Sequence, residues 1–263
     1  MRSNEPGFTL IEILIALVIA GIISTAIYNL YISQSRIYTQ QEQVSDMQQN
    51  ARVAMDIISR HIRMAGFGKP GWTTINSTSG ITYEIQVTDG GSGPDTLEIV
   101  GCIDAPPGTL SSAAASGATA ITLHSSAEAS KFNTTTKRDI FVGDLENAKV
   151  TNVSGAVLTI DTDPGLSGQG LGNAYPAGTN VYLVKRVTYT ITGRSLRRNE
   201  NTGAGAQQVA VNIEDLQVTY AKPMVTVSIT ARTQGRASYY TGDGYRRMTL
   251  TSDIIARNLV SSQ

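Results

Sequence analysis

The sequence predicts an α+β protein in which a long amino-terminal helix is packed on an antiparallel β-rich globular head. Two observations predict the helix: residues 8–31 are mostly apolar, and residues 32–65 repeat apolar side chains at helical spacing without Pro or Gly. A third observation predicts the head, because short alternating runs replace the helical period from residue 81 onward. At 263 residues, the chain is long enough to bury a sizeable core.

The first part of the predicted helix has the length and composition of a membrane span. From Phe8 to Ile27 every residue is apolar or small, apart from four exceptions. These are Thr9, Glu12, Ser24 and Thr25. About 20 helical residues extend roughly 30 Å, which matches the hydrocarbon core of a bilayer. The stretch is longer than the apolar core of an ordinary secretory signal and no A-x-A-like cleavage site follows it, so we expect it to be retained.

The second part of the helix carries a single apolar stripe at spacings of three, four and seven. The stripe consists of Ile37, Val44, Met47, Ala51, Ala54, Ile58, Ile62 and Ala65. Two glycines and then Pro70 in "MAGFGKPGW" predict the end of the helix. A continuous helix from Phe8 to Met64 would be roughly 85 Å long, half membrane anchor and half amphipathic spine.

The head is predicted from alternating runs such as "ITYEIQV", "TLEIV", "NVYLVKRVTYTI", "DLQVTY", "MVTVSIT" and "MTLTSDII". Segments rich in Gly, Ser, Asn and Pro separate these runs. We expect one antiparallel sheet, packed on the distal half of the spine.

Glu12 is an acidic residue within the apolar span. A charged group near the bilayer interior costs about 2.5–3.5 kcal/mol, so it should have a partner. No basic residue lies within a turn or two of it. A cut between Gly7 and Phe8 would create a positive amine on Phe8, four residues from Glu12. That amine would reach either its own Glu12 or the Glu12 of a neighbouring copy packed with an axial offset.

The segment "GFTLIEILIALVIAGI" resembles the class III signal of type IV pilins and of the pseudopilins of type II secretion. The resemblance implies cleavage between Gly7 and Phe8 by a prepilin peptidase, N-methylation of Phe8, and pairing of Glu12 with Phe8 in a filament core. The alternative is a single-pass anchor with an incidental glutamate. The implied division is a leader peptide at 1–7, a transmembrane and filament-core helix at 8–31, the amphipathic half of the spine at 32–65 and the head at 66–263.

Three further segments resemble the PilW-type minor pilins: "QNARVAMDIISRHIRMAGF", "SLRRNENTGAGAQQVAVNIEDLQVTY" and "GDGYRRMTLTSDIIARNLV". The resemblance implies a non-enzymatic subunit that primes assembly or sits at the pilus tip. Its implied partners are other major and minor pilins, prepilin peptidase, the inner-membrane assembly platform and membrane lipid before assembly. The implied location is the inner membrane, with a periplasmic head, and then the pilus. The alternatives are a minor pseudopilin and a membrane-tethered head that binds DNA or a surface ligand.

No pattern of catalytic, cofactor-binding or metal-ligating residues is found in the sequence. His61 and His124 have separate local contexts, which disfavours a zinc site. The single cysteine, Cys102, permits no internal disulfide and is expected to be a buried apolar residue. We therefore predict no catalytic residue, cofactor or metal.

Two Gly-rich acidic segments and one aromatic cluster leave alternatives open. "DTDPG" at 161–165 and "GDG" at 242–244 suit calcium or ordinary turns. A cluster near the carboxyl end suits nucleic-acid contact or strand packing equally. It comprises Tyr239, Tyr240, Tyr245, Arg246 and Arg247.

The formal charge is zero, with 21 basic and 21 acidic residues, so no global field indicates a nucleic-acid or polyanionic partner. The distribution is uneven: residues 66–182 carry a balance of −6 and residues 183–263 a balance of +6. This pattern fits either solvated surface charge or copies that meet through opposite faces.

Overall fold

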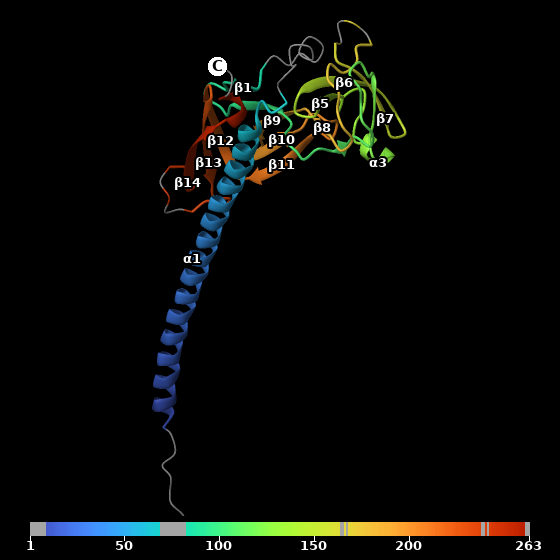
Figure 1. The fold of residues 1–263 in the computed structure, drawn as a ribbon. Coiled ribbons are helices and arrows are strands. Elements are labelled where there is room, and N and C mark those ends of the chain that lie inside the picture. The colour runs from blue at the N-terminus through green and yellow to red at the C-terminus, as the bar shows by residue number, and fades with distance from the viewer. Residues whose placement is uncertain are drawn as a thin grey trace, which may run out of the picture.

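A computed structural model describes residues 9–68, 83–163, 166, 168–237, 240 and 242–260. One long helix, α1 (Leu10–Met64), projects from a head made of two β-rich lobes (Figure 1). The predicted fold class, a long helix on an antiparallel β-rich head, is confirmed.

The helix is unbroken from Leu10 to Met64, and Thr9 is its N-cap. It ends where the glycines predict, because Gly66 has a φ of +76°, which favours glycine. A Cβ on Gly66 would lie 2.5 Å from a methyl group of Leu259, so this chain reversal also has no room for a side chain. Phe8, the predicted first residue, lies outside the described residues, as does Pro70.

The first lobe, beside α1, contains two antiparallel sheets. The five-stranded sheet has the order β1-β2-β9-β10-β11 and the three-stranded sheet the order β12-β13-β14. The strands of the first are β1 (Ile85–Thr88), β2 (Thr96–Gly101), β9 (Lys185–Thr192), β10 (Ser195–Asn199) and β11 (Ala206–Val211). Those of the second are β12 (Ile213–Ala221), β13 (Met224–Arg232) and β14 (Arg247–Ile255), and the short 3-10 helix η1 (Arg257–Leu259) follows them.

The second lobe is an insertion between β2 and β9. Gly101 at the end of β2 pairs directly with Lys185 at the start of β9, so the inserted chain leaves and returns at adjacent positions. Its six-stranded antiparallel sheet has the order β3-β8-β5-β6-β7-β4 and a separate apolar core. Its elements are β3 (Gly108–Thr109), β4 (Ala120–Thr122), α3 (Ser126–Ala129), β5 (Asp139–Val142), β6 (Glu146–Ser154), β7 (Val157–Asp161) and β8 (Asn180–Leu183).

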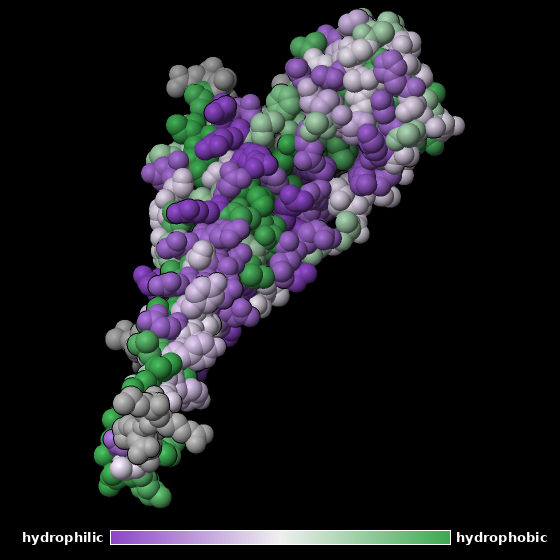
Figure 2. Space-filling view, turned by 90° about the horizontal axis from the view of Figure 1, so that it is seen from below, coloured by the Kyte–Doolittle hydropathy of each residue, from purple (hydrophilic) through white to green (hydrophobic). Residues whose placement is uncertain are grey.

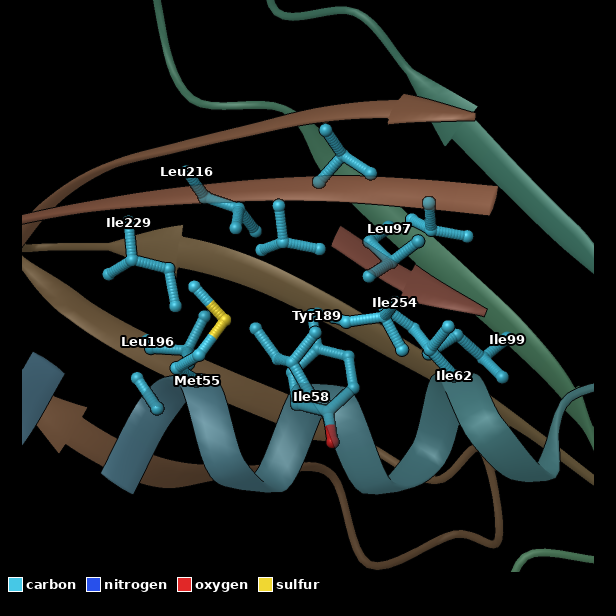
Figure 3. Packing of buried hydrophobic residues seen from close by; sticks show 14 of the residues in the cluster. Met55, Ile58, Ile62, Leu97, Ile99, Tyr189, Leu196, Leu216, Ile229 and Ile254 are labelled. Atoms are coloured by element: carbon cyan, nitrogen blue, oxygen red, sulfur yellow. The ribbon is translucent and has the colours of Figure 1, made fainter. Parts of the chain in front are cut away.

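The main core forms where the distal half of α1 packs on the first lobe. Met55, Ile58 and Ile62 point from the helix toward side chains of both sheets of that lobe (Figure 3). The predicted stripe is buried from Met47 to Ala65, whereas Ile37 is 46% exposed because only the connection between β13 and β14 comes near it, and a hollow remains between them. Met55 is buried although the stripe omitted it.

The predicted single sheet is wrong in two respects. Only the first lobe packs on the spine, and the head contains three sheets within the described residues. The run at 180–191 is two strands of different sheets, β8 and β9, which separate at Val184. The amide of Val184 donates to the carbonyl of Asp139 at 2.8 Å, so the chain crosses between lobes there.

Candidate functional site

The amino terminus of α1 contains a capping box formed by Thr9 and Glu12. Glu12 Oε2 accepts hydrogen bonds from the Thr9 amide at 2.9 Å and from Thr9 Oγ1 at 2.8 Å. Thr9 Oγ1 in turn lies 3.4 Å from the Glu12 amide. Each side chain thus accepts a hydrogen bond from a backbone amide that has no partner within the first helical turn.

One oxygen of this carboxylate is still available. Glu12 Oε1 accepts no hydrogen bond from the residues that the structure describes. A carboxylate can accept several hydrogen bonds on its two oxygens, and ammonium groups are among its strongest donors. The site can therefore keep its cap and accept a cation at the same time.

The helix around Glu12 is apolar and uncovered. Glu12 is the only charged residue between Leu10 and Tyr31, and every residue there is exposed in the isolated chain. Hydrophobic residues gather at the amino-terminal end of the helix, seen end-on in Figure 2. Within the described residues one helix, α1, is long and apolar enough to cross a membrane. Such a surface is unstable in water and suits lipid or other helices.

A comparison with known protein families matches the segment of the chain that contains Glu12. Residues 2–28 match the family model described as the prokaryotic N-terminal methylation motif. No curated protein and no solved structure matches the chain. The motif indicates a substrate of the prepilin type, as found among type IV pilins and pseudopilins, and the apolar helix with a β-rich head is consistent with that class of structural subunit.

Gly7 and Phe8 lie outside the described residues, so their predicted cleavage and pairing with Glu12 remain predictions. Sequence reasoning missed Thr9 as a partner of Glu12. The signal was present, because T-x-x-E before an apolar run is a capping-box pattern.

In the two Gly-rich acidic segments, Asp161 and Asp243 bind groups that are close to them in the sequence. Asp161 accepts hydrogen bonds from the amides of Asp163, Gly168 and Gln169, so both of its carboxylate oxygens are bound by nearby backbone. Asp243 pairs with Arg247 at 2.6 Å. No group of three or more His, Cys, Asp or Glu side chains among the described residues is arranged to hold a metal ion.

The aromatic and basic cluster is only partly assembled. The guanidinium of Arg232 lies 3.8 Å from the Tyr245 ring centroid and that of Arg236 lies 5.2 Å from it. Arg247 is bound to Glu214 as well as Asp243, so its charge is neutralised within the head. Arg246 is exposed, and Tyr239 lies outside the described residues. Arg232 and Arg236 were not in the predicted cluster, because they are near Tyr245 only through the β13–β14 hairpin.

His61 and His124 lie far apart in the fold, one on α1 against the first lobe and the other in the second lobe. His61 is buried on α1, where Nδ1 is 2.7 Å from the Tyr189 hydroxyl, and His124 is exposed just after β4. Cys102 is buried as predicted, and that burial raises the pKa of its thiol.

Burial, with a further contribution from Arg198, lowers the pKa of His61 from 6.5 to about 4. In the unfolded chain His61 is therefore protonated below about pH 6.5, whereas in the folded head it is protonated only below about pH 4. We expect this group to leave the stability unchanged above pH 7 and to lower it by about 3 kcal/mol as the pH decreases through this window. Denaturant unfolding of the full chain in detergent, followed at several pH values, measures the loss. His61→Gln should flatten the dependence and the exposed-site control His124→Gln should retain it; equal slopes in both variants would contradict this origin.

Proposed function

We propose that this chain is a minor pilin of a type IV pilus, a structural subunit that primes assembly or sits at the tip. Cleavage between Gly7 and Phe8 releases residues 1–7, and residues 8–31 then leave the membrane to pack against the helices of other pilins. The observation that carries the proposal is Glu12, a single carboxylate on an exposed apolar helix within the matched methylation motif. The resemblance of both chain ends to PilW-type minor pilins supports the finer assignment.

The exposed apolar side chains of the helix must exchange lipid for other pilin helices when the subunit leaves the membrane. Exposing them to water instead would cost about 25 cal/mol per Å² of apolar area. Because lipid is as apolar as these side chains, the preference for the filament comes from close helix packing and from paired polar groups. The buried apolar area does not by itself determine the axial register of neighbouring helices, because they could slide past one another and bury a similar area. Glu12 supplies the register, since its open oxygen accepts the Phe8 amine of an adjacent subunit and an unpaired carboxylate in that bundle is penalised.

Processing is tested by mass spectrometry of the protein purified from membranes and from sheared filaments. We expect the chain to begin at Phe8 with one methyl group on its amine. Gly7→Val, which places a branched side chain before the cut, should retain residues 1–7 and be absent from filaments. An intact Met1 in filament-borne protein would overturn the proposal.

A further inference from the structure

The connection between β13 and β14 is the part of the head that lies nearest the apolar half of α1 (Figure 1). We refer to its described residues, 233–237, 240 and 242–246, as the β13–β14 loop. The amide of Gly235 donates to Gln43 Oε1 at 3.1 Å, which fastens the loop to the helix. A shallow hollow between them is lined by Ser35, Arg36 and Thr39 on the helix and by Arg236, Ala237 and Tyr240 on the loop.

The described part of the loop has a defined backbone. The amide of Thr233 donates to the Arg246 carbonyl at 2.9 Å, and that of Ala237 donates to the Gly244 carbonyl at 2.8 Å. These bonds extend the hairpin beyond the sheet. Arg236 lines the hollow described above, and Arg246 lines a neighbouring hollow along α1; Tyr240 borders both. Arg236 also lies over the Tyr245 ring, which limits where its guanidinium can go.

Three arginines at this level have no acidic partner among the residues that the structure describes. Arg36, Arg236 and Arg246 are exposed, and none forms an ion pair with a carboxylate of the described residues. The next acidic residues along the helix are Glu42 and Asp46, about 9 and 15 Å further from the apolar half at 1.5 Å per residue. The loop carboxylate, Asp243, is already bound to Arg247. This face of the head is therefore positive.

The positive face begins near the height of a bilayer surface. If the span ends near Tyr31, Arg36 is about 8 Å beyond it along the helix, and Gln43, to which the loop is bound, is about 18 Å beyond it. The polar region of each leaflet is roughly 5–7 Å thick, and charges there are felt over a Debye length of about 8–10 Å. Tyr28 and Tyr31 are 63% and 70% exposed and occupy the level at which aromatic side chains mark a membrane interface.

We propose that Arg36, Arg236 and Arg246 form a contact surface for anionic phospholipid headgroups while the subunit is held in the membrane. The arginines bind the phosphodiester groups, and the bilayer thereby fixes the orientation of the head about α1 before the subunit is extracted. The proposal rests on the membrane-anchored state of the proposed function. Lipid is favoured over nucleic acid because, within the described residues, this is the part of the head nearest the bilayer, where phosphodiester groups are concentrated.

The test uses the full chain in lipid nanodiscs. Hydrogen exchange of the backbone amides at 232–237 and 242–247 is compared between discs of phosphatidylcholine alone and discs containing about a quarter phosphatidylglycerol. We expect exchange to slow at least threefold in the anionic discs, and the effect to shrink in high salt. The triple variant Arg36→Gln, Arg236→Gln, Arg246→Gln should lose it.

The matched control is Arg52→Gln, Arg63→Gln, Arg257→Gln, which removes the same charge from exposed arginines further from the span. It should keep the lipid response; an equal loss in both triple variants, or equal exchange in both kinds of disc, overturns the proposal. Protection by a DNA oligonucleotide without any response to phosphatidylglycerol also overturns it, in favour of nucleic acid. Glu12→Ala separates the two proposals, because it should keep the lipid response while failing to assemble.

Discussion

Glu12→Ala is expected to leave the chain in the membrane and to lower its recovery in sheared filaments at least tenfold. Removing a charge from the apolar helix makes insertion easier by about 2.5–3.5 kcal/mol, so the amount in the membrane should not fall. In the filament, the amine of a neighbouring Phe8 would lose its acceptor and lie unpaired among apolar side chains, which costs several kcal/mol. Immunoblots of membrane and filament fractions measure the two effects separately.

The capping box supplies the control for this experiment. Thr9→Ala removes the two hydrogen bonds of the Thr9 hydroxyl, but it keeps the carboxylate of Glu12 and the backbone amide at position 9 that donates to it. Losing a cap costs about 1 kcal/mol, and the effect is confined to the first turn. We expect Thr9→Ala to assemble at near-normal levels. Should Thr9→Ala and Glu12→Ala fail alike, the carboxylate would act only as a cap for its own helix and the pairing mechanism would be wrong.

The long helix was predictable because its signals are local. The apolar run, the stripe and the terminal glycines all follow from periodicity and backbone freedom, and the structure ends the helix at Met64 as expected. The β5–β6 hairpin was missed although Gly143 and Asp144 form its turn with φ near +60° at both positions. A Gly-Asp pair between two short apolar runs is a hairpin signal that strand propensity alone overlooks.

The division of the head was not predictable from local pattern. The run "NVYLVKRVTYTI" alternates smoothly, and nothing in it marks the crossing at Val184 from the inserted lobe to the first lobe. That crossing is fixed by distant pairings, Gly101 with Lys185 and Asp139 with Val184. The candidate site was easier to predict, because Thr9 and Glu12 are close in sequence. The sequence analysis identified Glu12 and missed only its hydrogen-bond partner Thr9.

Ile58→Ala is expected to lower the free energy of unfolding of the head by about 2–5 kcal/mol. Ile58 has no exposed surface and lies in the core between α1 and the sheets of the first lobe (Figure 3). Its truncation removes buried methyl and methylene groups and leaves a cavity that rigid strands on one side cannot fill. Urea unfolding of the full chain in detergent, followed by tyrosine fluorescence or circular dichroism, measures the change.

Val53→Ala on the same helix is the matched control, because Val53 is 40% exposed and should change stability by no more than about 0.5 kcal/mol. A small effect at Ile58 would mean that the head holds its shape without the spine. A large one means that the distal half of α1 is part of the head's core, so a fragment that starts at residue 66 should not fold. In that case the helix that fixes register through Glu12 also fixes the head, and any rotation of the core helix in a filament turns the head with it.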